Sequence, residues 1–245
     1  MKPTRAALSN DPGQQVTHSQ LVFELPHIPA LGSEDFFISA SNEQAVALIQ
    51  AWPDWPARFA VLTGPEGSGK THLANVWRAR SGAEAFAGSD VGQAIERARG
   101  GACAVVIEDI ERTLSDEQAA FHLLNLARER RFDVLLTART QPGAWAISLP
   151  DLRSRLRSAA LVTIEEPDEA LLGAVLVKLF DDRQISVEPG VIGYLLRRME
   201  RSMAAAQNLV EALDLAAFAE RRRVTRALAA KFFAAAEDPQ SQNGG

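Results

Sequence analysis

A glycine-rich segment, residues 64–71, constrains the fold of this chain more than any other feature. It has the pattern Gly-x-x-x-x-Gly-Lys-Thr and lies directly between an apolar run, residues 59–63, and a helix-prone stretch, residues 72–80. Glycines let a backbone curl until consecutive N–H groups point to one centre, and the N-terminus of the next helix adds partial positive charge. The pattern therefore predicts a strand, a phosphate-binding loop (P-loop) and a helix. A glycine-rich turn that binds nothing is the alternative.

Apolar runs of strand length alternate with helical stretches in the middle of the chain. The runs are residues 59–63, 102–107, 134–137 and 161–164. Such alternation predicts an α/β fold with a parallel sheet covered by helices. After residue 167 we expect helices alone, which predicts a small all-α domain; these helices are residues 168–180, 189–199, 202–221 and 225–236.

The expected domain organisation follows from these patterns. We expect a disordered tail, a short peptide with a linker, a P-loop nucleotide-binding domain, a helical domain and a second disordered tail. Their bounds are residues 1–19, 20–32, 33–166, 167–237 and 238–245.

Composition excludes several classes of protein. The 245 residues carry a formal net charge of −5, which argues against coating nucleic acid by bulk electrostatics. Their longest apolar runs fall short of the roughly 20 residues that cross a membrane. The single cysteine, Cys103, can form no internal disulfide, so we expect a cytoplasmic protein. Arg221, Arg222 and Arg223 form a local basic patch, for which a solvated helix end is the simplest interpretation.

The candidate phosphate site consists of the glycine-rich loop and the first residues after it. Within it, Lys70 is expected to reach the β and γ phosphates, and the hydroxyl of Thr71 to bind Mg²⁺. The candidate nucleotide-binding residues are Gly64, Pro65, Glu66, Gly67, Ser68, Gly69, Lys70, Thr71 and His72.

Two acidic residues follow the apolar run that ends at residue 107. Glu108 and Asp109 should lie at the carboxyl edge of the sheet, where ligands of open α/β folds gather. We expect Glu108 to bind the metal ion and Asp109 to activate water for hydrolysis. Two solvated acids at a strand end are the alternative.

Several segments together resemble the AAA+ module of the replication initiator family DnaA, and within it the Hda-type regulators in their alphaproteobacterial form. The resemblance covers residues 20–233 and rests on the P-loop, the strand end Ile-Glu-Asp-Ile at 107–110, and residues 135–139 and 149–156. Residues 36–38 and 41–43 match a stretch that lies beside the adenine in the family. The resemblance implies a five-stranded parallel sheet flanked by helices and followed by an all-α lid, with ADP or ATP and Mg²⁺ as cofactors.

The resemblance also implies a function, regulation of DNA replication initiation. Such a regulator would promote hydrolysis of ATP bound to DnaA, and Arg155 falls where the family carries an arginine finger that acts in trans. A plain basic surface around Arg153 and Arg157 is the alternative. The expected protein partners are DnaA and the DNA polymerase III sliding clamp (β subunit), with a second copy of the chain as a further candidate.

A short peptide near the N-terminus resembles the clamp-binding motif of such regulators. It has the sequence Gln-Leu-Val-Phe-Glu-Leu at residues 20–25, and its expected contacts are Gln20 at the rim of a groove with Leu21, Phe23 and Leu25 inside it. An edge strand packed on the domain is the alternative.

Some positions depart from the family pattern. Glu108 stands where Asp is usual, Arg139 where a residue is usually acidic or small and polar, and Ala204 where an arginine usually contacts the γ-phosphate. Arg201, three residues before Ala204, is expected on the same helix face as a substitute. We therefore expect weak or no intrinsic hydrolysis. The chain also stops too soon after Arg223 for a helix-turn-helix domain, so no direct sequence-specific DNA binding is expected. An autonomous P-loop ATPase that remodels or loads another protein is the alternative function.

Overall fold

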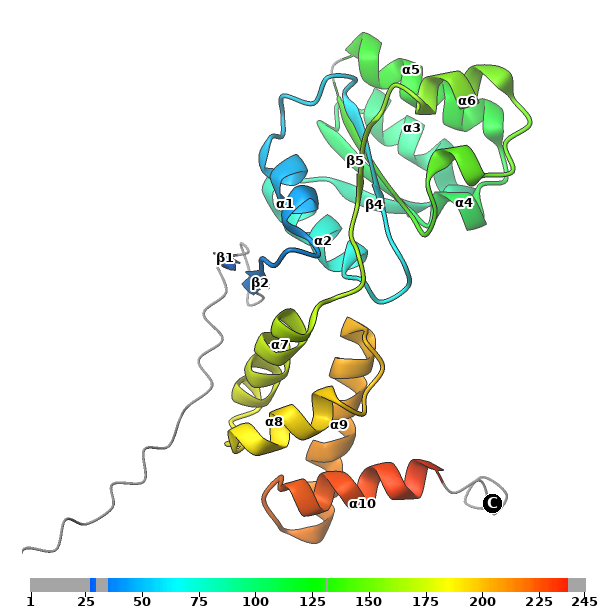
Figure 1. Cartoon of the computed structure of the whole chain (residues 1–245). Coiled ribbons are helices and arrows are strands. Elements are labelled where there is room, and N and C mark those ends of the chain that lie inside the picture. The colour runs from blue at the N-terminus through cyan, green and yellow to red at the C-terminus, as the bar shows by residue number, and fades with distance from the viewer. Residues whose placement is uncertain (1–26, 30–34, 131, 238–245) are drawn as a thin grey trace, which may run out of the picture.

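The computed structural model describes residues 27–29, 35–130 and 132–237 (Figure 1). Its central element is a five-stranded sheet with the order β4-β5-β6-β3-β7, in which every neighbouring pair is parallel. The strands are β3 (Phe59–Thr63), β4 (Glu84–Ala87), β5 (Ala104–Glu108), β6 (Asp133–Ala138) and β7 (Ala160–Thr163). The parallel sheet confirms the predicted fold class.

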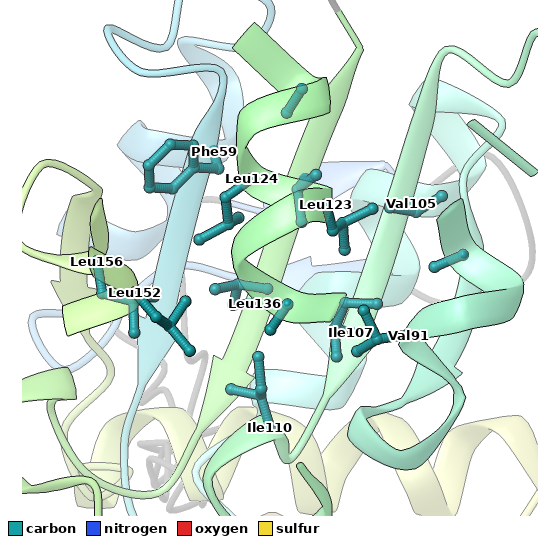
Figure 2. Packing of buried hydrophobic residues seen from close by; sticks show 14 of the residues in the cluster. Phe59, Val91, Val105, Ile107, Ile110, Leu123, Leu124, Leu136, Leu152 and Leu156 are labelled. Atoms are coloured by element: carbon teal, nitrogen blue, oxygen red, sulfur yellow. The ribbon is translucent and has the colours of Figure 1, made fainter. Parts of the chain in front are cut away.

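Burial explains why the three central strands could be predicted. Every residue of β3 and β6 is buried, because helices cover both faces of the sheet. On one face lie α3 (Val91–Arg99), α5 (Glu117–Arg130) and α6 (Pro150–Leu156), and Figure 2 shows Leu123 and Leu124 over Leu136 and Ile107. On the other face lie α1 (Glu43–Gln50) and α2 (Lys70–Ser81). Shorter elements connect these layers: α4 (Ile110–Thr113), η1 (Gly88–Asp90) and η2 (Pro142–Ala144).

The strand register brings the candidate site together. Thr63 at the end of β3 pairs with Ala138 of β6, and Ile107 of β5 pairs with Leu136 of the same strand. The carboxyl ends of β3, β5 and β6 therefore meet at one edge of the sheet. The loops that follow them carry the P-loop, the acidic pair and Arg139.

Four helices follow the sheet and form a lid with its own core. They are α7 (Glu169–Asp182), α8 (Pro189–Leu196), α9 (Met203–Glu220) and α10 (Arg226–Glu237). The side chains of Asp168 and Ser202 cap α7 and α9 by accepting hydrogen bonds from Leu171 N–H and Ala205 N–H. A separate cluster of buried apolar side chains fills the space between the helices. Figure 1 shows this lid below the α/β part of the chain, which confirms the predicted all-α lid.

A small antiparallel pair, β1 (His27–Pro29) and β2 (Asp35–Phe37), precedes the sheet. Gln20, Leu21, Phe23 and Leu25 lie outside the described residues, and so do the two predicted tails. Among the helices that the structure describes, none has the length and apolar character to cross a membrane.

Candidate functional site

The backbone of residues 64–69 forms a tight loop at the carboxyl end of β3. Gly67 and Gly69 have φ values of 73° and 102°, in the left-handed region that favours glycine. A Cβ atom on Gly64 would lie 2.3 Å from the carbonyl oxygen of Ile164. These glycines are therefore needed for the loop to pass beside β7 and enter α2, whose first residue is Lys70.

Lys70 lies at the centre of this loop. Its side chain is 7% exposed, and its Nζ donates hydrogen bonds to the carbonyl oxygens of Gly64 at 2.8 Å and Pro65 at 2.7 Å. Burial lowers the pKa of Lys70; the charge of Asp109 raises it, and that of Arg139 lowers it further. The loop thus holds an ammonium group that has little water around it, which favours the binding of an anion.

The structure brings both predicted acids to the same edge. Glu108 ends β5, and Asp109, the residue before α4, has a left-handed backbone with φ 46°, while its N–H donates to Thr137 Oγ1 at 3.1 Å. Thr137 is buried in β6, so it fixes Asp109 beside the neighbouring strand.

The predicted Mg²⁺ ligands fit a site that needs phosphate to complete it. Thr71 is exposed in the first turn of α2, and Glu108 is half-buried at the end of β5. In the described part of the chain, no group of three or more His, Cys, Asp or Glu side chains could hold a metal ion. Mg²⁺ typically binds one or two protein ligands together with phosphates and water, which this donor set allows.

Two residues near the P-loop were not among the predicted site residues. Arg139, directly after β6, forms an ion pair with Glu66 at 2.6 Å. Its N–H donates to Glu111 Oε1 at 2.7 Å, while Glu111 Oε2 is buried without a hydrogen-bond partner. A signal for Glu111 existed in the sequence, because it lies two residues after the acidic pair at the end of β5.

A pocket lies between the lid and the P-loop. Its apolar lining comes mainly from α7, with Phe37 of β2, and polar side chains of α2, α7 and α9 and of Asn42, directly before α1, line it as well. The lining residues include Phe37, Asn42, Ser68, Gly69, His72, Leu171, Val175, Leu179, Met203 and Gln207. Asn42 fixes the wall, since its Nδ2 donates to the carbonyl oxygen of Phe37 at 2.9 Å and its Oδ1 accepts from Ser39 N–H at 2.9 Å. The pocket combines apolar walls with polar groups, including the charged side chains of Lys178 and Asp182, as small-molecule sites do.

The lid also contacts the P-loop directly. The N–H of Met203, the first residue of α9, donates to the carbonyl oxygen of Gly67 at 2.8 Å. Arg201 precedes this helix in an exposed bend, so the expectation that it shares a helix face with Ala204 was wrong. The extended backbone of the capping residue Ser202 turns the chain before the helix begins.

Arg155 belongs to a different part of the molecule. It lies on α6, and its Nη2 donates to Asn125 Oδ1 on α5 at 2.7 Å. The guanidinium carbon is 6.0 Å from the ring centre of Phe121, also on α5. Arg155 is therefore half-buried and held by α5, whereas the predicted P-loop and acidic residues gather at the sheet edge.

A parallel sheet with a P-loop, an acidic residue after a nearby strand and an all-α lid define a AAA+ module. Solved structures support this class of fold. Domain III of the Thermotoga maritima replication initiation protein DnaA has a TM-score of 0.71 at 13% identity, covering 82% of this chain and 95% of that one. The Thermotoga maritima RuvB Holliday junction branch migration motor has a TM-score of 0.63 at 15% identity, covering 80% and 68%.

A longer relative is the AMPPCP-bound DnaA from Aquifex aeolicus, with a TM-score of 0.62 at 18% identity. The match covers 75% of this chain and 64% of the Aquifex chain, so this chain spans less than two thirds of that relative. No curated protein matches the sequence significantly. The family model for the lid domain of Hda matches residues 172–231. The C-terminal helical segment is thus similar to the lid domain of Hda, and the chain has the fold of the DnaA AAA+ module.

Proposed function

We propose that this chain is a regulator of DNA replication initiation that binds ADP or ATP and promotes hydrolysis of the ATP bound to DnaA. The observation that carries the proposal is the combination of an Hda-type lid with a P-loop in which a buried lysine faces an acidic strand end. The Aquifex DnaA structure, which contains the ATP analogue AMPPCP, supports an adenine nucleotide as the ligand.

In this proposal the nucleotide binds across the P-loop and the pocket beneath the lid. Lys70 and the loop N–H groups hold the phosphates, and the wall that contains Phe37 and Asn42 faces the base. Thr71 and Glu108 would hold Mg²⁺, which neutralises phosphate charge when bound. Lys70→Ala should abolish binding of ADP and ATP in calorimetry, because it removes the buried cation at the centre of the loop.

The hydrolysis that matters takes place in DnaA. Arg155 acts there as an arginine finger, a guanidinium that stabilises the charge of the phosphoryl-transfer transition state. Its support in this structure is the platform of Asn125 and Phe121, which holds the half-buried side chain in one orientation. Pre-orientation of this kind lowers the entropy cost of presenting a long side chain to a partner.

The decisive experiment reconstitutes the full chain with clamp on DNA and DnaA·ATP. Arg155→Ala should bind nucleotide and clamp normally yet fail to accelerate hydrolysis on DnaA. Arg157→Ala, an exposed arginine next to the same helix, is the matched control and should retain stimulation. If the Arg155→Ala variant still stimulates hydrolysis of DnaA-bound ATP fully, Arg155 is not the arginine finger.

Clamp binding rests on residues 20–25, outside the described residues. A Gln20→Ala, Leu21→Ala double variant should lose retention on clamp in a pull-down. Val22→Ala, Glu24→Ala is the control, since these side chains alternate with the proposed contacts. Unchanged retention of the first variant would remove the clamp from the proposal.

One observation favours a second candidate, an autonomous ATPase. The backbone of Asp109 is held by Thr137 at the sheet edge that carries the P-loop, where a carboxylate can activate water for hydrolysis in cis. Turnover by the isolated chain that Asp109→Asn abolishes would support this candidate. Stimulation confined to DnaA·ATP would support the first.

A further inference from the structure

The end of α9 that lies away from the P-loop carries three consecutive arginines beside an exposed aromatic ring. Arg221, Arg222 and Arg223 follow α9 and form an arginine cluster in which all three residues are exposed. Phe218, in the last turn of the same helix, is 84% exposed. Figure 1 shows this end of α9 on the side of the lid that faces away from the sheet, so the cluster is separate from the P-loop and from Arg155.

The ring and the arginine cluster line one groove on the surface of the lid. Its remaining walls come from the end of α9 and from the segment after α7, where Gln184 supplies an amide and Ser186 a hydroxyl. A flat apolar ring, three cations and neutral hydrogen-bonding groups therefore lie together in one site.

Phe218 and Leu215 present an apolar surface to the solvent. Leu215 lies one helical turn before Phe218 and is 65% exposed. In the described part of the chain, no other large apolar side chain is as exposed as these two. Removing a phenylalanine ring from water is favourable, so a partner that covers Phe218 gains free energy that folding of the chain leaves unused.

The carboxylates near the arginine cluster pair with other cations. Asp214, which also lines the groove, pairs with Arg183 at 4.0 Å, and Glu220 accepts a hydrogen bond from Lys231. Within the described ranges, no carboxylate forms an ion pair with any of the three clustered arginines. Adjacent like charges repel one another, so the cluster favours an anionic partner.

We propose that this groove binds single-stranded nucleic acid, with Phe218 stacked on a base and the arginine cluster in contact with phosphates. Cations along the backbone and aromatic rings against the bases are the usual elements of such sites. Binding of this kind is independent of sequence, because neither a guanidinium on a phosphate nor a ring on the face of a base identifies that base. The proposal goes beyond the regulatory function proposed above and does not depend on it.

The exposed ring favours a single strand over other anionic partners. In a duplex the bases are stacked on one another, so a duplex could use the arginine cluster but would leave Phe218 in water. An acidic peptide would supply negative charge without a flat base for the ring. The whole chain has a formal net charge of −5, so binding of a polyanion should depend on this local site rather than on the overall charge.

Fluorescence anisotropy of the full-length chain with labelled oligodeoxythymidine, single-stranded or paired with its complement, tests the contribution of the ring. The wild-type chain should bind the single strand more tightly than the duplex. Phe218→Ala should weaken single-strand binding by at least about fivefold, because it removes the stacking on one base, and should leave duplex binding nearly unchanged. Phe218→Trp should bind like wild type. Leu215→Ala, which removes a neighbouring exposed side chain that has no ring, is the matched control and should have a much smaller effect.

The arginines are tested by the dependence of single-strand binding on salt. Arg222→Gln combined with Arg223→Gln should reduce the slope of log affinity against log salt concentration by about 1.4, or about 0.7 for each phosphate contact. Arg128→Gln combined with Arg157→Gln is the matched control, because both are exposed arginines outside the lid and their loss changes the net charge by the same amount. This control should retain the wild-type slope.

Several outcomes would show that the proposal is wrong. They are wild-type binding that is absent or equally tight for the duplex, equal single-strand affinities of Phe218→Ala and Phe218→Trp, and equal salt slopes of the two pairs of arginine variants. Poly-glutamate should compete weakly with the oligonucleotide at the same concentration of negative charge. Equal competition would identify an acidic peptide as the partner and would also overturn the proposal. Thermal unfolding of all variants checks folding, and since the substituted residues are exposed, the midpoints should stay close to that of wild type.

Discussion

The N–H of Met203 in the lid donates a hydrogen bond of 2.8 Å to the carbonyl oxygen of Gly67 in the P-loop. Gly67 is also in close contact with the residue before Met203, because a Cβ added to it would lie 2.6 Å from Ser202 Cβ. The loop that is proposed to bind phosphate is thus also the surface on which α9 begins. Changes at this contact should affect stability and nucleotide binding together.

Gly67→Ala should reveal this double role. The left-handed φ costs an alanine roughly 1–2 kcal/mol, and the contact with Ser202 adds to it. Gly82→Ala is the control, since Gly82 has φ 71° and a Cβ added there would meet no heavy atom within 4 Å. We expect both variants to lose stability in urea unfolding and only Gly67→Ala to lose nucleotide affinity. If Gly67→Ala and Gly82→Ala lose equal stability and both keep the wild-type affinity for nucleotide, the P-loop does not have this double role.

Nucleotide binding should take up protons as the pH approaches the lowered pKa of Lys70. Burial lowers the pKa of Lys70, so the free protein loses this proton at a lower pH than an ordinary lysine does, whereas bound phosphate favours the charged form. Affinity should therefore fall as pH rises through the lowered pKa. Calorimetry in two buffers of different ionisation enthalpy measures the uptake. Where the Lys70→Arg variant still binds nucleotide, its binding should show no proton uptake, because arginine stays charged. Binding heats of the wild-type chain that do not depend on the buffer would refute the prediction.

Asn42→Ala should separate binding of the base from binding of phosphate. It removes the two hydrogen bonds that hold the wall at Phe37 and should cost about 1–3 kcal/mol of stability. We expect weaker ADP binding with unchanged competition by pyrophosphate. Asn75→Ala, an exposed asparagine that accepts a hydrogen bond from Arg78, should change neither. A parallel loss for pyrophosphate would place the effect in the P-loop instead.

Asp133 should give the stability of the chain a specific dependence on pH. Burial raises the pKa of Asp133, while the hydrogen bond from Trp52 and the charge of Arg58 offset part of this. The folded chain then holds this proton more tightly than the unfolded chain. The contribution of Asp133 to the unfolding free energy should fall as pH rises from the ordinary carboxyl pKa through the raised one, and stay level above it. Asp133→Asn removes this titration. If the unfolding free energies of wild type and variant, measured in urea, differ by the same amount at every pH, the prediction is wrong.

Strands β3, β5 and β6 could be predicted because they are buried apolar runs between turn signals, and β7 because its residues are mostly apolar although only one is buried. The exception is β4, with the sequence Glu-Ala-Phe-Ala and no fully buried residue. It lies at the sheet edge, where half-exposed positions weaken the apolar pattern. The helices of the lid were predicted to within three residues at each end, since capping residues and prolines mark where three of them begin.

The site divides in the same way into local and tertiary features. The P-loop and the acidic pair are local motifs whose residue types carry the chemistry, so the sequence contains them. The Glu66–Arg139 pair and the contact of Met203 with Gly67 join segments that are distant in sequence. Charged side chains and backbone groups that are far apart in the chain form no local sequence motif. Only the packing of the strands and the lid brings them together.

The helix that begins at the P-loop has a geometric consequence. α9 contains 18 residues, so its two ends are about 27 Å apart. Its far end carries Phe218, which is 84% exposed, followed by Arg221, Arg222 and Arg223. A tilt of about 10° around the Gly67 contact would swing that end by about 5 Å, given this length. A small rotation of α9 at the Gly67 contact would therefore appear at its far end as a displacement about the size of an amino-acid side chain.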